Sequence, residues 1–113
     1  MLDLNKGSKW NSDESTNKNV DELKLITSSA SLAKSTIIND YHLLAIELQQ
    51  LLNDLVKECK MKGADHDALH LWLEPLMQDI KNMEKVSEIH EAQVIYNKVI
   101  ERLNIYNTYF EKK

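Results

Sequence analysis

Apolar residues recur every three or four positions along most of the chain, which is the repeat of an amphipathic α-helix. The clearest stripe comprises Tyr41, Leu44, Leu48, Leu51, Leu52, Leu55, Val56 and Cys59. Weaker stripes of the same period precede and follow it. The pattern therefore predicts four helices of about 18 to 22 residues, each about 30 Å long at the helical rise of 1.5 Å per residue.

Polar segments and capping signals set the expected boundaries of the first helix. Residues 1–12 are mostly polar around Trp10 and predict an extended leader, so the expected domain is residues 13–113. Ser12 or Asp13 is the expected N-cap. Serines beyond residue 27 compete for backbone hydrogen bonds and predict a break near residues 34–39. The inward stripe would comprise Val20, Leu23, Ile26 or Thr27, Ala30 and Ala33.

The remaining boundaries follow from glycine, proline and polar residues. The second helix is expected to run to Met61, with Gly63 as its left-handed C-terminal cap. The third begins at Ala64 or Asp65, and Pro75 predicts either a kink or the start of a new helix. The last spans about residues 87–110. The inward residues of these two helices would be His66, Leu69, Leu73, Leu76, Ile80 and Met83, then Ile89, Val94 or Ile95, Val99, Leu103, Tyr106 and Phe110.

Four amphipathic segments joined by short links predict an all-α fold, an antiparallel up-and-down four-helix bundle. Composition supports this, because two glycines and one proline in 113 residues are too few for the turns of a multi-stranded sheet protein. The length suits one domain. Lys and Arg number 14 against 18 Asp and Glu, a net charge of −4 without a basic cluster, which argues against nucleic-acid binding. No apolar run is long enough for a transmembrane segment.

Four metal-donor side chains fall within twelve positions where the second and third helices should meet: Cys59, Met61, His66 and His70. The two histidines are four residues apart, so on a helix their rings lie on one face and can share an ion. Two soft sulfur donors with imidazole favour Cu(I), and zinc is the second candidate. Asp65 and Asp67 would either orient an imidazole N–H or interact with the helix dipole. The sequence therefore predicts a metal site.

Two motifs carry a resemblance to a family. Gly7-x-Lys9-Trp10-x-x-Asp13-Glu14-x-Thr16, followed by Cys59-x-Met61-Lys62-Gly63-x-x-His66-x-x-Leu69-His70, resembles a group of small exported helical proteins of Bacteroidetes-type bacteria. The resemblance implies a periplasmic or cell-surface, lipoprotein-like protein whose signal lies outside this chain, with Met1 as an added or alternative start. It implies no particular activity.

Two other functions remain open. In the first, the chain is a protein-interaction module in which the helical surface or the leader around Trp10 binds another protein, and Cys59 is structural. In the second, it binds haem, with Met61 and either His42 or His90 as axial ligands across the bundle.

An enzyme is not expected. The sequence has no glycine-rich phosphate loop, and a Cys59–His66 dyad would lack a third residue to orient the histidine. Trp72 is expected to pack against the end of the bundle rather than to contact a ligand.

Overall fold

The computed structural model describes residues 2–32 and 34–112, so Met1, Ala33 and Lys113 lie outside the described part. Its helices are α1 (Glu14–Ala30), α2 (Ile38–Glu58), α3 (Gly63–Lys85) and α4 (Ile89–Tyr109), with short strands β1 (Trp10–Ser12) and β2 (Phe110–Lys112). Each helix packs against its neighbours in sequence, and α1 also packs against α4. The predicted all-α, four-helix fold is confirmed.

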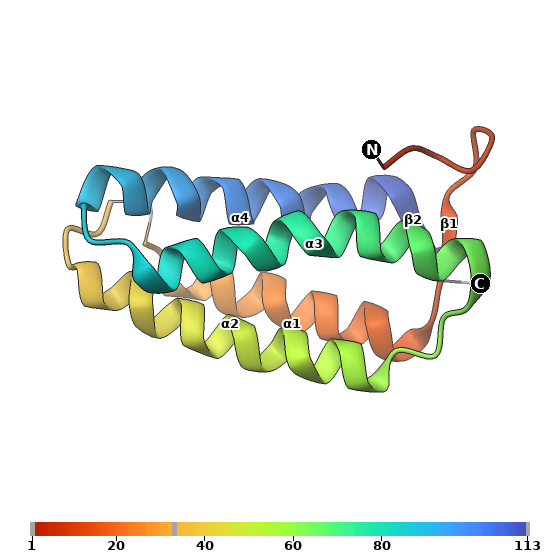
Figure 1. Cartoon of the computed structure of the whole chain (residues 1–113), viewed down its shortest axis with the longest axis horizontal. Coiled ribbons are helices and arrows are strands. Elements are labelled where there is room, and N and C mark those ends of the chain that lie inside the picture. Colours follow the sequence, from red (N-terminus) through yellow and green to blue (C-terminus); the bar gives the residue numbers. More distant parts are fainter. Residues whose placement is uncertain (1, 33, 113) are drawn as a thin grey trace.

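The two ends of the bundle differ. Figure 1 shows the α1–α2 and α3–α4 links at one end, and the α2–α3 link together with both strands at the other. We call the second the strand end; it contains β1, β2 and residues 59–62. All four donors predicted to bind metal belong to segments that meet there.

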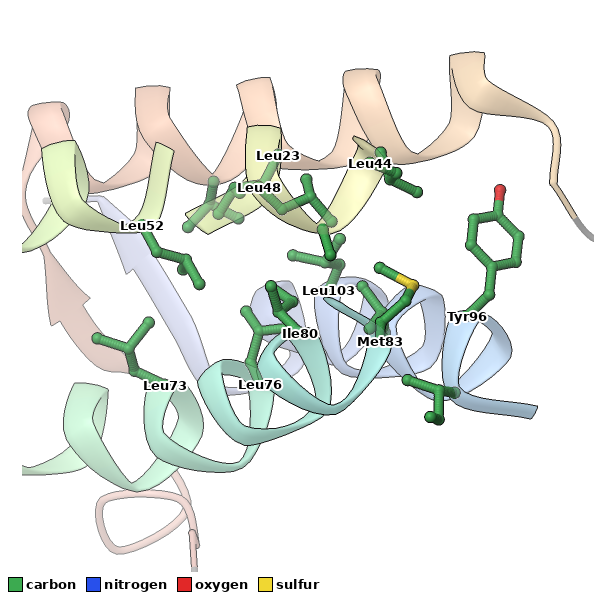
Figure 2. Packing of buried hydrophobic residues seen from close by; sticks show 14 of the residues in the cluster. Leu23, Leu44, Leu48, Leu52, Leu73, Leu76, Ile80, Met83, Tyr96 and Leu103 are labelled. Atoms are coloured by element: carbon green, nitrogen blue, oxygen red, sulfur yellow. The ribbon is translucent and has the colours of Figure 1, made fainter. Parts of the chain in front are cut away.

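A continuous apolar core joins the helices. Figure 2 shows Leu48 and Leu52 of α2 facing the layer formed by α3 and α4, with Leu76 and Ile80 of α3 among the residues opposite. Several buried polar groups in this core are hydrogen-bonded: the Tyr96 hydroxyl, for example, donates to the Thr27 carbonyl at 2.8 Å. Such pairing removes most of the penalty of burying a polar atom.

The start of α1 agrees with the sequence. Asp13 is the N-cap, and its carboxylate accepts a hydrogen bond from the Thr16 amide at 2.8 Å. Of the two alternatives for one inward position, Thr27 is 1% exposed and Ile26 is only half-buried. The helix ends at Ala30 with Ser31 in the left-handed conformation, so it ends before the predicted break. Ala33, predicted to face inward, lies outside the described residues.

The end of α2 differs from the prediction. The helix ends at Glu58 rather than Met61, and Val56 is 49% exposed instead of lying on the inward stripe. Gly63 does have a positive φ of 65°, but it is the first residue of α3 and not the cap of α2. The physical reason is tertiary: side chains of the α1 start bond the backbone at Glu58 and Lys60, as described below, and hold the chain away from a helical path.

The other helices are also shifted from the predicted boundaries. α3 is continuous from Gly63 to Lys85 with Pro75 inside it, so the predicted alternative of a new helix at Pro75 is wrong. α4 begins two residues after Ser87, and Glu88 caps it by accepting from the His90 and Glu91 amides. The helix ends at Tyr109, because Phe110 leaves it to enter β2. Of the alternatives Val94 and Ile95, Ile95 is the buried one.

The leader is more ordered than an extended polar segment. β1 pairs with β2 in parallel, with Trp10 opposite Phe110. Before it, residues 5–8 form a tight turn in which Lys6 and Gly7 both have positive φ, the geometry that favours glycine. Trp10 is half-buried against the core, as expected for a residue that anchors the leader. The leader strand β1 and the C-terminal strand β2 are therefore joined at the strand end.

Candidate metal site at the strand end

The link between α2 and α3 is held by the first residues of α1. The Asp13 carboxylate accepts a hydrogen bond from the Lys60 amide at 2.6 Å, in addition to its capping bond to Thr16. The Ser15 hydroxyl donates to the Glu58 carbonyl at 2.9 Å. The backbone on both sides of Cys59 is therefore held by the residues at the start of α1.

Asp65 contacts the leader. Its carboxylate accepts a hydrogen bond from the Asn11 amide of β1 at 3.0 Å. Asp65 also lies in the first turn of α3, where a carboxylate interacts favourably with the helix dipole. The sequence predicts that Asp65 either orients an imidazole N–H or interacts with the helix dipole; the structure shows it bonded to the backbone of β1 in the first turn of α3. Asp67 is exposed.

The structure brings His66 and His70 together. Their Nε2 atoms are 2.9 Å apart, and the two rings meet nearly edge to face with centroids 4.4 Å apart. Both histidines lie in the first turns of α3 and are half-buried. The spacing of four residues thus produces the convergence that the sequence predicts. Without an ion between them, one Nε2 carries the proton and the other accepts it.

The second nitrogen of His66 has no partner. Within residues 2–32 and 34–112, only His66 Nδ1 and Thr16 Oγ1 are buried side-chain polar atoms without a hydrogen bond. Both belong to the strand end, since α1 and α3 both begin there. A buried N–H without an acceptor is rare, so the favoured tautomer has Nδ1 bare and Nε2–H donating to His70. Buried atoms without partners mark a place that a ligand or solvent molecule can satisfy.

Both sulfur donors lie on the neighbouring link. Cys59 is the C-cap of α2 and Met61 follows two residues later; each is half-buried against the core. Across the described ranges, no three side chains among His, Cys, Asp and Glu come close enough to hold a metal ion. The structure therefore brings the two imidazoles into contact, but Cys59 does not form a group of three metal ligands with them.

Two ionisable groups at the strand end, Tyr106 and Asp13, have shifted pKa values. Burial raises the pKa of Tyr106 to about 12; a hydrogen bond with Ser12 opposes the rise, and the negative charges of Asp13 and Asp21 add to it. Burial also acts to raise the pKa of Asp13, but its hydrogen bonds with Thr16, Lys60 and Ser15 outweigh burial and lower it.

Aromatic side chains of α3, α4 and β2 pack against one another at the strand end. Trp72 packs against Tyr106 with ring centroids 4.9 Å apart, and Tyr106 stacks on Phe110 at 4.9 Å. The Trp72 Nε1–H donates to the Arg102 carbonyl at 2.7 Å. Trp72 is 2% exposed, so its predicted packing role is confirmed.

The other two histidines lie away from this end. His42, in the first turns of α2, has its Nε2 2.5 Å from the Val86 carbonyl, and His90 is exposed in the first turn of α4. Met61 follows His42 by nineteen residues, most of them in α2, which separates the two by about 25 Å along the helix. The geometry opposes the pairing of Met61 with His42 or His90 as axial ligands of one haem, because such ligands must meet at one iron.

Sequence reasoning missed the residues that hold the link. Asp13 was recognised as a cap, but its bond to Lys60 was not, and Asn11 and Ser15 were not singled out. All three act between segments more than 40 residues apart, and no local pattern marks them.

Comparisons with protein-family models, with curated proteins and with solved structures find no match for this chain. Among the helices of the described residues, none has the length and apolar character needed to cross a membrane.

Proposed function

We propose that this protein is a small antiparallel up-and-down helical bundle that binds one transition-metal ion, Cu(I) preferred and zinc second, at the strand end. His66 and His70 would be the nitrogen ligands and Cys59 and Met61 the sulfur ligands. The observation that carries the proposal is the 2.9 Å separation of the two imidazole Nε2 atoms. The exported localisation implied by the two sequence motifs is retained as part of the proposal.

The imidazole geometry needs little change to hold an ion. Metal–nitrogen bonds of about 2.0 to 2.1 Å with angles between roughly 90° and 110° place two nitrogen ligands about 2.9 to 3.4 Å apart. The observed separation lies at the lower edge of that range. An ion entering between the rings would replace the shared proton, and both Nε2 lone pairs would then point at the metal.

The sulfur ligands require movement of the link. Residues 59–62 belong to neither helix. The middle of this segment is held by the hydrogen bond that the Lys60 amide donates to the Asp13 carboxylate. A shift of this short segment toward α3 would add a thiolate and a thioether to the two imidazoles. Two sulfurs among four ligands favour Cu(I) over a structural zinc site.

The proposed metal binding depends on pH, because it releases a proton from Cys59 and requires neutral imidazoles. The Cys59 thiol loses its proton to solvent on binding, and both imidazoles must be neutral. In the loaded state the ring proton of His66 would move from Nε2 to Nδ1, and this buried N–H would then need a solvent molecule as its acceptor. Affinity should therefore decrease as the pH falls, because protons compete with the ion for the Cys59 sulfur and the two imidazoles.

The test is a competition titration with a chromogenic Cu(I) chelator under anaerobic conditions. The wild-type protein should withdraw one equivalent of Cu(I), and His66→Ala or His70→Ala should weaken binding at least tenfold. His90→Ala is the matched control, because His90 is an exposed helical histidine far from the strand end. Cys59→Ser and Met61→Leu measure the two sulfurs separately.

Two results would contradict the proposal. One is a wild-type protein that removes no Cu(I) from the chelator and no Zn²⁺ from a comparable zinc indicator. The other is a loss in His90→Ala equal to that in His70→Ala, which would indicate non-specific histidine binding. Far-UV circular dichroism of each variant confirms that the helices are retained.

A further inference from the structure

A groove on the outer surface between α1 and α2 is separate from the metal site. Its volume is about 510 Å³, and its lining residues are Ile26, Ser29, Ala30, Leu32, Asp40, Leu43, Leu44 and Glu47. The small side chains of Ser29 and Ala30 explain why the surface of α1 is hollowed here. The groove lies along both helices rather than at the strand end, so it shares no residue with the proposed metal site.

The floor and edges of this groove expose apolar side chains. Leu43 is 57% exposed on the α2 side, and Leu25 is 61% exposed on α1, one turn before Ser29. Single exposed leucines are common on protein surfaces. Here the exposed Leu43 lines a depression whose other lining residues are mostly apolar, which is typical of a surface that binds another protein segment.

The charged residues of the groove are all acidic. Asp40 and Glu47 line it, and none of the lining residues in the described chain is Lys, Arg or His. The two carboxylates are seven residues apart on α2, which is two helical turns or about 10 Å. Leu43 and Leu44 lie between them. An apolar strip bounded by two carboxylates is therefore complementary to an apolar residue flanked by two cations.

We propose that this groove binds a basic amphipathic α-helix of a partner protein. Leucine-like side chains of the partner would cover Leu43 and Ala30, and Lys or Arg side chains two turns apart would meet Asp40 and Glu47. A helix suits the shape, because the ridge of a third helix fits the groove between two packed helices.

Charge separates this partner from other occupants. A second copy of the chain would place the same carboxylates against each other, and each copy carries a net charge of −4. A membrane surface containing anionic lipids would meet the same repulsion. The groove is also open rather than enclosed, whereas small-molecule sites bury most of their ligand.

The test uses a fluorescein-labelled peptide of about 18 residues, long enough to form a helix, with leucine on one face and lysine on the other. A second peptide of the same pattern carries glutamate in place of lysine. Fluorescence anisotropy should detect saturable binding of the lysine peptide and no binding of the glutamate peptide. Leu43→Asp should weaken binding at least tenfold.

Matched variants separate the apolar and charged contributions. Asp40→Asn combined with Glu47→Gln should weaken binding several-fold and flatten its dependence on salt. Val94→Asp is the control, because Val94 is 42% exposed on α4, and it should bind like the wild-type protein. His70→Ala should also bind normally, so failure of this proposal is distinguishable from failure of the metal site.

Four outcomes would overturn the proposal. Equal binding of both peptides, or equal losses in Leu43→Asp and Val94→Asp, would show that the groove is not selective. Binding to vesicles of anionic phospholipid in preference to the peptide would identify a membrane surface instead. A dimer in sedimentation analysis that Leu43→Asp dissociates would identify a second copy as the occupant. Circular dichroism establishes that each variant remains folded.

Discussion

Replacing Asp13 tests how the strand end is held together. This single carboxylate caps α1 through the Thr16 amide and fixes the α2–α3 link through the Lys60 amide. Asp13→Ala removes both hydrogen bonds. Asp13→Asn keeps a side chain that caps equally well but carries no charge.

The expected loss follows from the individual contacts. Removing an N-cap costs about 0.5 to 2 kcal/mol. A hydrogen bond to a charged group contributes about 1.5 to 3 kcal/mol, which applies to the bond from the Lys60 amide. Asp13→Ala should therefore lower the free energy of unfolding by about 2 to 5 kcal/mol, and Asp13→Asn by about half as much.

Urea denaturation followed by far-UV circular dichroism measures these differences. The matched control is Asp54→Ala, which removes an exposed carboxylate from α2 and should change stability by less than about 0.5 kcal/mol. Losses in Asp13→Ala no larger than those in Asp54→Ala would refute the idea that Asp13 fastens the link. A loss confined to Asp13→Ala, with Asp13→Asn like the wild type, would show that capping matters and the charge does not.

The pH dependence provides an independent check on Asp13. Its pKa is lower in the folded protein than the ordinary value of 3.8, because its hydrogen bonds outweigh the effect of burial. The stabilisation is therefore complete above about pH 4 and is lost as the pH falls through the lower folded pKa. Stability of Asp13→Asn should lack this component of the acid dependence.

Two further predictions concern the core and the alkaline range. Because the pKa of Tyr106 is about 12 in the folded protein, the unfolded chain loses this proton first as the pH rises. Wild-type stability should then decrease by about 2 to 3 kcal/mol between pH 10 and pH 12, whereas Tyr106→Phe lacks this component in urea titrations; an equal alkaline loss in both would contradict it. Leu48 is fully buried, so Leu48→Ala should cost about 2 to 5 kcal/mol by the same assay, while the exposed Leu43→Ala costs less than about 0.5 kcal/mol. Similar losses of stability in the two leucine variants would contradict the assignment of Leu48 to the core and Leu43 to the surface.

Local sequence patterns were sufficient for the helices. Periodic leucines predicted α2 and much of α3, and the acidic N-cap Asp13 was visible because it precedes a helical stripe. The convergence of His66 and His70 was also predictable, since it depends only on a spacing of four residues within one helix. Features determined by the spacing of residues within one helix were thus predictable from the sequence.

Features set by distant segments were not accessible. β1 and β2 have three residues each and pair across almost the whole chain, so neither has a readable period. The end of α2 depends on Asp13 and Ser15, more than 40 residues earlier. Pro75 predicted either a kink or the start of a new helix, and α3 continues through it because burial of Leu73 and Leu76 on either side favours one helix.

The most direct test of the proposed metal site is nitrogen NMR of the imidazole rings during addition of Cu(I), which is diamagnetic. We predict that Nε2 of His66 and His70 shift together and saturate at one equivalent, while the signals of His42 and His90 stay unchanged. Equal shifts in all four histidines, or no shift in His66 and His70, would contradict the assignment of this end of the bundle to metal binding.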